Sequence, residues 1–335
     1  MTTAGLDLLV VGDCNPDVLV VGDDVTPDFG QREKLVGSIS LVVGGSAAIT
    51  AVAAARLGLR VGLAAAIGTD AAGDFMLGRL AAEGVTTAAV VRRPDLATGL
   101  TVVLSDSTDR AILTATGAMT SLTAADVSPG LLRGVRHVHV SSYFLLEHSL
   151  GPGLAALLAR ARSGGARTSL DTNWDPAGRW GGSQLRDVLA QTDLLLPNEE
   201  EARRLSGQQS LEAAVAELTG RGPSVVVKLG AAGALCAGRS GLREVDTPEL
   251  AGPVVDTTGA GDCFNAGLIT GLLQGRDLPG ATRLGCAAGS ASIRGAGGTA
   301  AAPSLAAALA LAGLPGPPGP PLSGPVSGRS AGSHR

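Results

Sequence analysis

Apolar segments of two kinds alternate along the chain, and their order predicts an α/β fold. Short apolar runs typical of buried strands lie at residues 6–11, 61–67, 85–91, 137–140, 168–170, 193–196 and 224–229. Longer segments with helical spacing follow most of them, at residues 44–58, 70–83, 150–162, 259–275 and 281–294. This alternation predicts a mainly parallel sheet covered by helices on both faces. Glycines and polar residues follow several strands, so we expect a binding site at the carboxyl edge of the sheet.

Two segments, residues 14–43 and 98–116, depart from this alternation. Both contain apolar stretches without a helical period, and a polar turn at residues 105–109 divides the second. We expect β-structure that projects from the main sheet, as either a lid or an ordinary surface hairpin. Residues 314–335 are rich in Pro and Gly and are expected to be disordered, which leaves residues 1–313 as one folded domain.

The composition narrows the class of protein and its partners. Hydrophobic residues make up 45% of the chain and aromatic residues 2%, so the core is expected to consist of Ala, Val and Leu. The formal net charge is −4 and no basic block is present, which argues against nucleic acid as a partner. The four cysteines lack the spacing of a zinc site, so we expect reduced thiols and a cytoplasmic location. We expect neither a signal peptide nor a membrane-spanning segment.

Gly259, Gly261 and Asp262 lie in a stretch that is typical of a strand, a glycine turn and a helix. Val254 and Val255 are expected to end the strand, and apolar residues at helical spacing follow Asp262. A helix start presents unpaired N–H groups and a partial positive charge, and glycine lets an anion approach that backbone closely. The turn can therefore hold a phosphate, with Asp262 placed to accept a proton from an attacking hydroxyl. The alternative is an ordinary capped helix.

Polar residues near the first strand suggest a second part of the site. Asn15 and Asp17 follow that strand, where they could bind hydroxyl groups or simply form a turn. Gly44 and Gly45 precede a helix for which Ser46 is the predicted N-cap.

Two more motifs follow later strands. Asn198 and Glu201 have the spacing of a capping box at a helix start. Lys228 comes near the end of a strand, and Gly230 and Gly233 form a glycine turn that is a weak signal by itself. The chain contains no Gly-x-x-x-x-Gly-Lys-Ser/Thr, which excludes a P-loop kinase. No Gly-x-Gly-x-x-Gly follows the first strand, which argues against a dinucleotide-dependent dehydrogenase.

The order of these motifs resembles one protein family. The run Asp-Thr-Thr-Gly-Ala-Gly-Asp-Cys-Phe-Asn-Ala-Gly at residues 256–267 resembles the C-terminal signature of the ribokinase-like (PfkB) carbohydrate kinases. Residues 44–58 resemble the N-terminal signature, except that Ile49 stands where the family usually has Asn. The resemblance covers roughly residues 6–310 and implies a ribokinase-like three-layer α/β/α sandwich with a small β-lid formed by residues 14–43 and 98–116.

The resemblance also implies roles for individual residues. Asp262 would be the catalytic base, and the backbone N–H groups of Gly259, Ala260 and Gly261 would form the anion hole for the transferred phosphoryl group. The implied sugar-binding residues are Asn15, Asp17, Gly44 and Gly45. The implied ATP-binding residues are Lys228, Gly230, Gly233 and Thr258. The implied metal sites are Asn198 and Glu201, which would bind Mg²⁺ through water, and Asp256 and Thr258, which would bind K⁺. A homodimer through the lid is implied as well.

The resulting hypothesis is ATP-dependent phosphorylation of a hydroxyl group on a small carbohydrate. The hydrocarbon side chain of Ile49 suggests a substrate that lacks a hydroxyl at that point. Two alternatives remain at this level: a nucleoside kinase of the adenosine type within the same family, and a sugar-binding regulator without catalytic activity.

Overall fold

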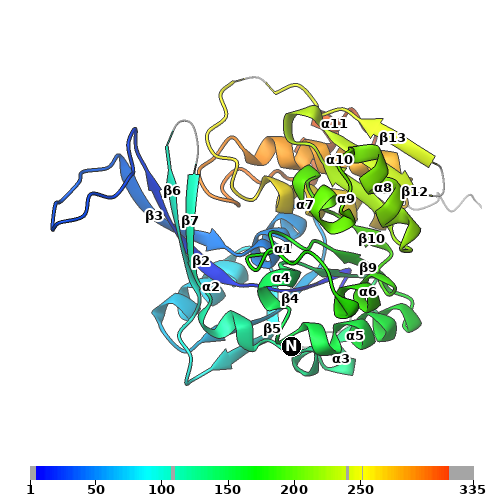
Figure 1. Ribbon diagram of the computed structural model, residues 1–335, viewed down its shortest axis with the longest axis horizontal. Coiled ribbons are helices and arrows are strands. Elements are labelled where there is room, and N and C mark those ends of the chain that lie inside the picture. Colours follow the sequence, from blue (N-terminus) through cyan, green and yellow to red (C-terminus); the bar gives the residue numbers. More distant parts are fainter. Residues whose placement is uncertain (1–4, 107–109, 239–240, 251, 317–335) are drawn as a thin grey trace, which may run out of the picture.

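A nine-stranded sheet runs through the centre of the protein in the computed structural model, which describes residues 5–106, 110–238, 241–250 and 252–316 (Figure 1). The strand order is β13-β12-β11-β10-β9-β8-β1-β4-β5, and all neighbours pair in parallel except β11 with β12 and β12 with β13. The bounds are β1 Leu8–Val11, β4 Val61–Gly68, β5 Thr86–Arg93, β8 His137–Val140, β9 Arg167–Leu170, β10 Leu194–Leu195, β11 Ser224–Lys228, β12 Ala234–Gly238 and β13 Gly241–Val245. The predicted mainly parallel sheet is therefore confirmed.

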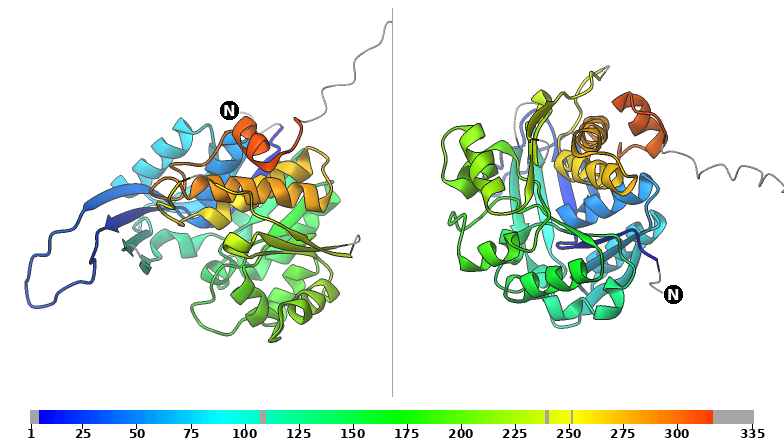
Figure 2. Two further views of the ribbon diagram at one scale, coloured as in Figure 1. Left: turned by 90° about the horizontal axis from the view of Figure 1, so that it is seen from above. Right: turned by 90° about the vertical axis from the view of Figure 1, so that its right-hand side faces the viewer.

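Helices cover both faces of this sheet, which gives the predicted three-layer α/β/α sandwich (Figures 1 and 2). One face carries α1 Ser46–Arg56, α2 Ala71–Ala82, α9 Ala260–Leu273, α10 Leu278–Ser292 and α11 Leu305–Ala312. The other carries α3 Pro129–Leu132, α4 Tyr143–Leu146, α5 Gly151–Ser163, α6 Ser183–Leu189, α7 Glu199–Ser206 and α8 Leu211–Gly220. The central strands are buried on both sides, as their continuous apolar runs require.

Small residues bring helices α9 and α10 into close contact. A methyl group on Gly267 would lie 2.7 Å from the Leu284 carbonyl oxygen, and one on Gly271 would lie 2.7 Å from the Ala281 Cα. The glycines therefore set the distance between two helix backbones. This packing holds α9, whose first turn faces the carboxyl edge of the sheet.

A second, four-stranded sheet has the order β3-β2-β6-β7 and stands beside the main body (Figure 1). Its strands are β2 Asn15–Val21, β3 Ser38–Gly44, β6 Leu100–Ser105 and β7 Arg110–Ala115, so it combines the two segments that departed from the strand-helix alternation. Strand β2 joins them by pairing in parallel with β6. We call this sheet the lid sheet.

None of the helices in the described part of the chain is both long and apolar enough to cross a membrane. Of the predicted disordered tail, residues 317–335 lie outside the described residues.

Candidate active site

The glycine turn before α9 has the backbone that the sequence predicts. Gly259 is the N-cap of α9 with φ of 73°, and a methyl group on it would lie 2.6 Å from the Gly298 Cα. Only glycine fits there without moving the neighbouring chain. The predicted strand before the turn is wrong: Val254 and Val255 belong to no strand and are 60% and 55% exposed. No strand among the described residues pairs with these two valines, so their β-propensity does not produce a strand.

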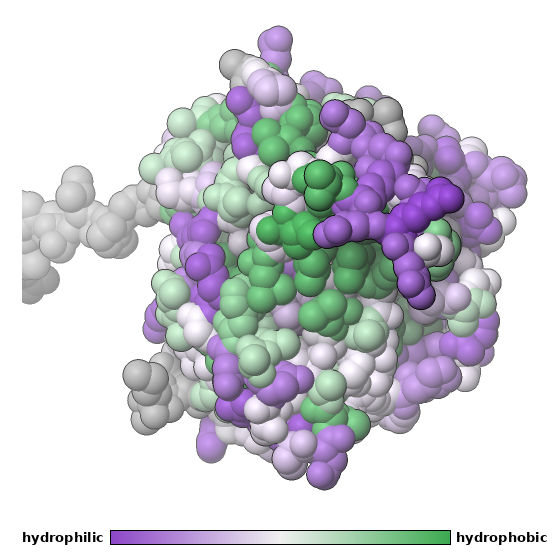
Figure 3. Space-filling model, turned by 90° about the vertical axis from the view of Figure 1, so that its left-hand side faces the viewer, coloured by the Kyte–Doolittle hydropathy of each residue, from purple (hydrophilic) through white to green (hydrophobic). Residues whose placement is uncertain are grey.

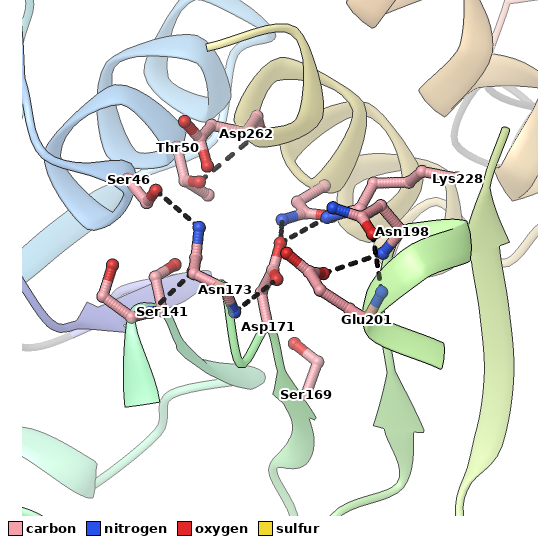
Figure 4. A network of polar contacts seen from close by, with 12 residues as sticks. Ser46, Thr50, Ser141, Ser169, Asp171, Asn173, Asn198, Glu201, Lys228 and Asp262 are labelled. Carbon is pink, nitrogen blue, oxygen red and sulfur yellow. Dashed lines mark hydrogen bonds and ion pairs between the residues drawn. The ribbon is translucent and has the colours of Figure 1, made fainter. Parts of the chain in front are cut away.

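Asp262 lies in the first turn of α9 and is only 7% exposed. Burial, followed by the nearby Asp171 carboxylate, raises its pKa well above the ordinary value, and the Lys228 ammonium partly offsets this. In Figure 4, Ser46 and Asn173 lie close to Asp262 on one side of the network. A carboxylate with a raised pKa is a stronger base than an exposed one, which suits a general base at a helix start.

Asp171 connects the two halves of this network. Its Oδ2 accepts hydrogen bonds from Lys228 Nζ at 2.5 Å and from Asn265 Nδ2 at 2.6 Å (Figure 4). Burial alone would raise the pKa of Asp171, but the charge and hydrogen bond of Lys228, with Asn265, hold it below its usual range. The ammonium nitrogen also lies 3.5 Å from the position that a Cβ on Gly261 would occupy, so this cation stands beside the glycine turn.

The Asn198–Glu201 capping box forms as predicted. Asn198 Oδ1 accepts the Glu201 N–H at 2.8 Å, and Glu201 Oε2 accepts the Asn198 N–H at 2.8 Å. Burial, followed by Asp171, raises the pKa of Glu201 to about 7. The second oxygen of Glu201 has no hydrogen-bond partner among the described residues, so one carboxylate oxygen is left for a water or a cation.

Gly230 and Gly233 follow β11 in a tight turn with positive φ, and only Gly230 is exposed.

On the inner face of the lid sheet, Asn15 and Asp17 form a polar cluster with Thr101. Asn15 Nδ2 donates to Asp17 Oδ1 at 2.9 Å and to Thr101 Oγ1 at 3.0 Å. Burial, followed by the Asp13 charge, raises the pKa of Asp17 to about 7. Gly44 is required beside this cluster, because a methyl group there would lie 1.9 Å from Asp17 Oδ1.

The predicted N-cap of α1 is wrong. Gly45, with φ of 80°, is the N-cap, and Ser46 is the first helical residue. The Asp13 carboxylate reaches from the end of β1 and accepts the N–H groups of Ser46 and Ala47, both at 3.0 Å. The Ser46 side chain is thereby free to accept a hydrogen bond from Asn173 Nδ2 at 2.9 Å.

Ile49 packs beneath the glycine turn. It is 3% exposed, and its Cδ1 lies 2.5 Å from the position that a Cβ on Gly298 would occupy. Its Cγ2 lies 3.0 Å from the corresponding point on Gly259. The hydrocarbon therefore supports the turn that precedes α9, which gives a packing reason for an apolar residue at this position.

Asp256 ties the segment before the turn to a distant loop. Its Oδ1 accepts the Thr258 N–H at 2.8 Å, and its Oδ2 accepts the Gly297 N–H at 2.7 Å. Arg110 of the lid sheet donates to Thr257 Oγ1 at 3.1 Å and to Thr258 Oγ1 at 3.3 Å. The lid sheet therefore contacts the residues that lead into the glycine turn.

The structure brings the predicted residues to one edge of the sheet, together with six that were not predicted as site residues. These are Asp13, Ser46, Thr101, Asp171, Asn173 and Asn265. Asp13 and Asp171 follow strands β1 and β9 closely, so position at a strand end was an available signal. Thr101 and Asn265 carry no such signal, because each reaches the site through the pairing of elements distant in sequence.

Comparison with known proteins places these motifs in one family. The model of the pfkB family of carbohydrate kinases matches residues 6–305. Among curated proteins, a ribokinase of Haemophilus influenzae is 30% identical over 89% of this chain and 95% of its own length. An ATP-dependent 6-phosphofructokinase of Thermoanaerobacterium thermosaccharolyticum is 26% identical over 89% and 94%. A nucleoside kinase of Methanothermobacter thermautotrophicus is 29% identical over 81% and 84%.

Solved structures agree with the sequence relatives. An E. coli protein assigned as ribokinase II, solved in complex with ATP and Mg²⁺, superimposes with a TM-score of 0.79 at 25% identity, covering 91% of this chain and 98% of that one. The family match extends over nearly the whole described structure, and the relatives are covered almost end to end. The chain therefore belongs to the pfkB family of carbohydrate kinases.

Proposed function

We propose that the protein transfers the γ-phosphate of ATP to a hydroxyl group of a small carbohydrate. The observation that carries this proposal is the position of Asp262, a buried carboxyl group in the first turn of α9 directly beside a half-buried glycine turn. The raised pKa of Asp262 favours proton uptake from an acceptor hydroxyl. The turn supplies backbone N–H groups and the positive end of a fourteen-residue helix.

The glycine turn and Lys228 would hold the phosphoryl group together. The N–H groups of Gly259 and Gly261 have no hydrogen-bond partner among the described residues, whereas the Ala260 N–H donates to the Thr257 carbonyl at 3.3 Å. An arriving phosphoryl group would compete with that long bond. The Lys228 ammonium beside Gly261 adds a full positive charge where negative charge would develop.

The residues proposed for Mg²⁺ fit an indirect role. The described residues contain no group of three or more His, Cys, Asp or Glu side chains arranged to hold a metal ion. Because the capping box engages Asn198 Oδ1 and Glu201 Oε2, the other carboxylate oxygen of Glu201 is left without a hydrogen bond from the described residues, which suits a magnesium-bound water. Bound Mg²⁺ would neutralise charge on the ATP phosphates. Glu201 would orient the water.

A K⁺ site at Asp256 and Thr258 is also proposed. Each Asp256 oxygen accepts one backbone N–H and keeps a second lone pair, so the carboxylate could still contact a cation. Replacing K⁺ by tetramethylammonium in the assay should lower kcat if the site is used. Equal rates in both salts would contradict it.

Asp262→Asn tests the catalytic role. We expect kcat to fall about 10²–10⁴-fold, the usual contribution of a general base. The variant should remain folded, because the raised pKa means that ionisation of Asp262 opposes folding above its unfolded-state pKa. ADP release and circular dichroism measure the two effects, with the exposed Asp24→Asn as the matched control. Near-normal turnover in Asp262→Asn would refute the assignment.

Nucleoside phosphorylation is the second candidate, favoured by the similarity to a nucleoside kinase over most of the chain. A panel of ribose, fructose, adenosine and cytidine with ATP and Mg²⁺ separates the candidates by which compound gives the fastest release of ADP.

We also propose a cytoplasmic location, supported by four free, buried cysteines.

We propose that the outer face of the lid sheet pairs two copies of the protein. The strand registers place eight apolar residues on this face: Val18, Val20, Ile39, Leu41, Val102, Leu104, Ala111 and Leu113. Figure 3 views this side of the molecule, where hydrophobic residues gather. Large exposed apolar patches usually mark interfaces. Leu113→Glu should therefore yield monomers in light scattering, whereas Ile112→Glu, similarly exposed but on the opposite face, should not.

A further inference from the structure

Two residues that follow neighbouring strands of the main sheet adopt the left-handed backbone conformation that favours glycine. Ser142, two residues after β8, has φ of 59°, and Asn173, three residues after β9, has φ of 54°. Such conformations are unfavourable for most side chains and are enriched at active sites. One hydrogen bond joins the two residues, because the Ser142 N–H donates to Asn173 Oδ1 at 2.8 Å. The Asn173 side chain therefore ties together the chain segments that leave two paired strands.

This bond fixes the direction in which the Asn173 amide acts. A backbone N–H only donates, so the amide oxygen must face Ser142 and the amide nitrogen must face the other way. Asn173 Nδ2 donates to Ser46 Oγ at 2.9 Å (Figure 4). Because an amide NH₂ group has no acceptor site, it cannot take the Ser46 hydroxyl proton in return.

The Ser46 hydroxyl proton is thereby available to Asp262. The Ser46 N–H is held by the Asp13 carboxylate, so the hydroxyl is not needed to cap α1. Burial raises the pKa of Asp262, and a hydrogen bond from the Ser46 side chain acts in the opposite direction. The hydrogen bonds therefore run in one direction, from Ser142 through Asn173 and Ser46 to the carboxylate of Asp262.

We propose that Asn173 is a positioning residue for the catalytic base: acting through Ser46, it directs a hydroxyl proton at Asp262 and holds that carboxylate toward the acceptor. The inference rests on the proposed function, because it concerns the base of that reaction. In the reaction the acceptor oxygen attacks the γ-phosphorus and ADP leaves, while the acceptor O–H bond breaks and an O–H bond forms on Asp262. The Ser46 hydroxyl occupies one carboxylate oxygen and leaves the other to take this proton. The chain does not carry the proton away, since Asn173 Nδ2 cannot accept it.

Loss of the Ser46 hydrogen bond should raise the pKa of Asp262, because a hydrogen bond to a carboxylate stabilises its charged form. A base with a higher pKa is protonated over a wider pH range, so the rate should fall most at low pH. The other titratable groups that act on Asp262 or sense it are unchanged in the variants below: Asp171, Lys228, Asp13 and the buried thiol of Cys263.

Asn173→Gly tests the proposal, because glycine adopts a φ of 54° without strain and removes the amide. We use the purified full chain with ATP, Mg²⁺ and the acceptor that gives the fastest release of ADP in the panel above. The ratio of kcat/KM for that acceptor at pH 9 to kcat/KM at pH 6 should rise at least about fivefold. Gln31→Gly is the matched control, since Gln31 has φ of 61° but is exposed in the connection between β2 and β3; its ratio should equal that of the wild type. A higher KM for the acceptor with an unchanged ratio would overturn the proposal and indicate that Asn173 binds the acceptor directly.

Ser46→Ala and the double variant test whether Asn173 acts through Ser46. Ser46→Ala should raise the same ratio at least as much as Asn173→Gly, because it removes the hydroxyl itself. Adding Asn173→Gly to Ser46→Ala should change the ratio less than about twofold, since the two residues form one chain. Full additivity of the two effects would overturn the chain, even if each residue affects the rate. Wild-type turnover with an unchanged ratio in both single variants would contradict the positioning role alone, whereas no ADP release by the wild type with any acceptor would contradict the kinase function itself.

Discussion

Removing the Lys228 ammonium should destabilise the fold, because it leaves a buried carboxylate without its cation. The side chains of Lys228 and Asp171 are 14% and 2% exposed. Removing one partner of a buried pair costs about 3–5 kcal/mol. In Lys228→Met, Asp171 keeps the hydrogen bond from Asn265, so we expect the lower end, about 3 kcal/mol.

The loss should depend on pH in a defined direction. In the wild type, Lys228 holds the pKa of Asp171 below its unfolded-state value of about 3.9, so the pair contributes fully above that pH and loses its contribution as the pH falls through the folded-state pKa. In Lys228→Met, the Asn265 hydrogen bond remains but the charge that outweighs burial is gone, so the pKa of Asp171 rises and ionisation opposes folding above about pH 4. The difference in free energy of unfolding between variant and wild type should therefore be larger at pH 8 than at pH 5.

Urea unfolding followed by circular dichroism at both pH values measures this difference. The double variant Lys228→Met/Asp171→Asn should recover at least about 2 kcal/mol relative to Lys228→Met, because neither charge remains buried. Lys34→Met is the control: it breaks an exposed ion pair and should leave the free energy of unfolding unchanged. A loss below about 1 kcal/mol in Lys228→Met, or a double variant no more stable than it, would refute the reasoning.

Three further predictions concern the lid sheet. Gly44→Ala should raise the KM for the acceptor and leave the KM for ATP unchanged in steady-state kinetics, because its methyl group would displace Asp17; equal changes in both constants would contradict this. Asp17→Asn should raise the Tm at pH 8 but not at pH 4, because the folded-state pKa of Asp17 is raised to about 7 and its ionisation opposes folding above the unfolded-state value of about 3.9. Thermal unfolding that shifts equally at both pH values would count against it. Arg110→Ala should increase ADP formation relative to phosphorylated product, because the hydrogen bonds to Thr257 and Thr258 hold the lid sheet against the glycine turn and limit access of water. Arg110→Lys should restore part of the coupling between ATP consumption and phosphorylation of the acceptor. An unchanged ratio of ADP to phosphorylated product in Arg110→Ala would argue against this role of Arg110.

The sequence was most informative where a local rule decides the structure. The alternation of apolar runs predicted the layered fold, and the spacing of Asn198 and Glu201 predicted a capping box that forms with both hydrogen bonds. The glycine at position 259 predicted a backbone conformation that other residues adopt less readily, and Gly259 has this conformation. The capping box and the glycine turn each depend on residues only a few positions apart, and the layered fold follows from a pattern repeated along the chain.

The sequence was less informative where distant segments compete. Ser46 has the chemistry of an N-cap, but the carboxylate of Asp13, 33 residues earlier, takes that role. The valines at 254 and 255 favour a strand, yet no strand in the described part of the chain pairs with them. Asn265 lies within the recognised motif, but its bond to Asp171 depends on the packing of α9 over β9. Such choices depend on tertiary contacts, which a local pattern does not encode.

The two roles that we propose for the lid sheet fall on opposite faces of strands whose side chains alternate with a period of two residues. Along β2, Asp17 and Leu19 face the site, whereas Val18 and Val20 face outward. Substitutions at even positions of β2 should therefore affect the proposed self-association, and substitutions at its odd positions the proposed acceptor recognition. Inserting a single residue ahead of Asp17 would exchange the two sets, moving valines into the acceptor site and a carboxylate into the apolar face. The length of β2 ahead of Asp17 is therefore more tightly constrained than the identity of any one outward-facing side chain.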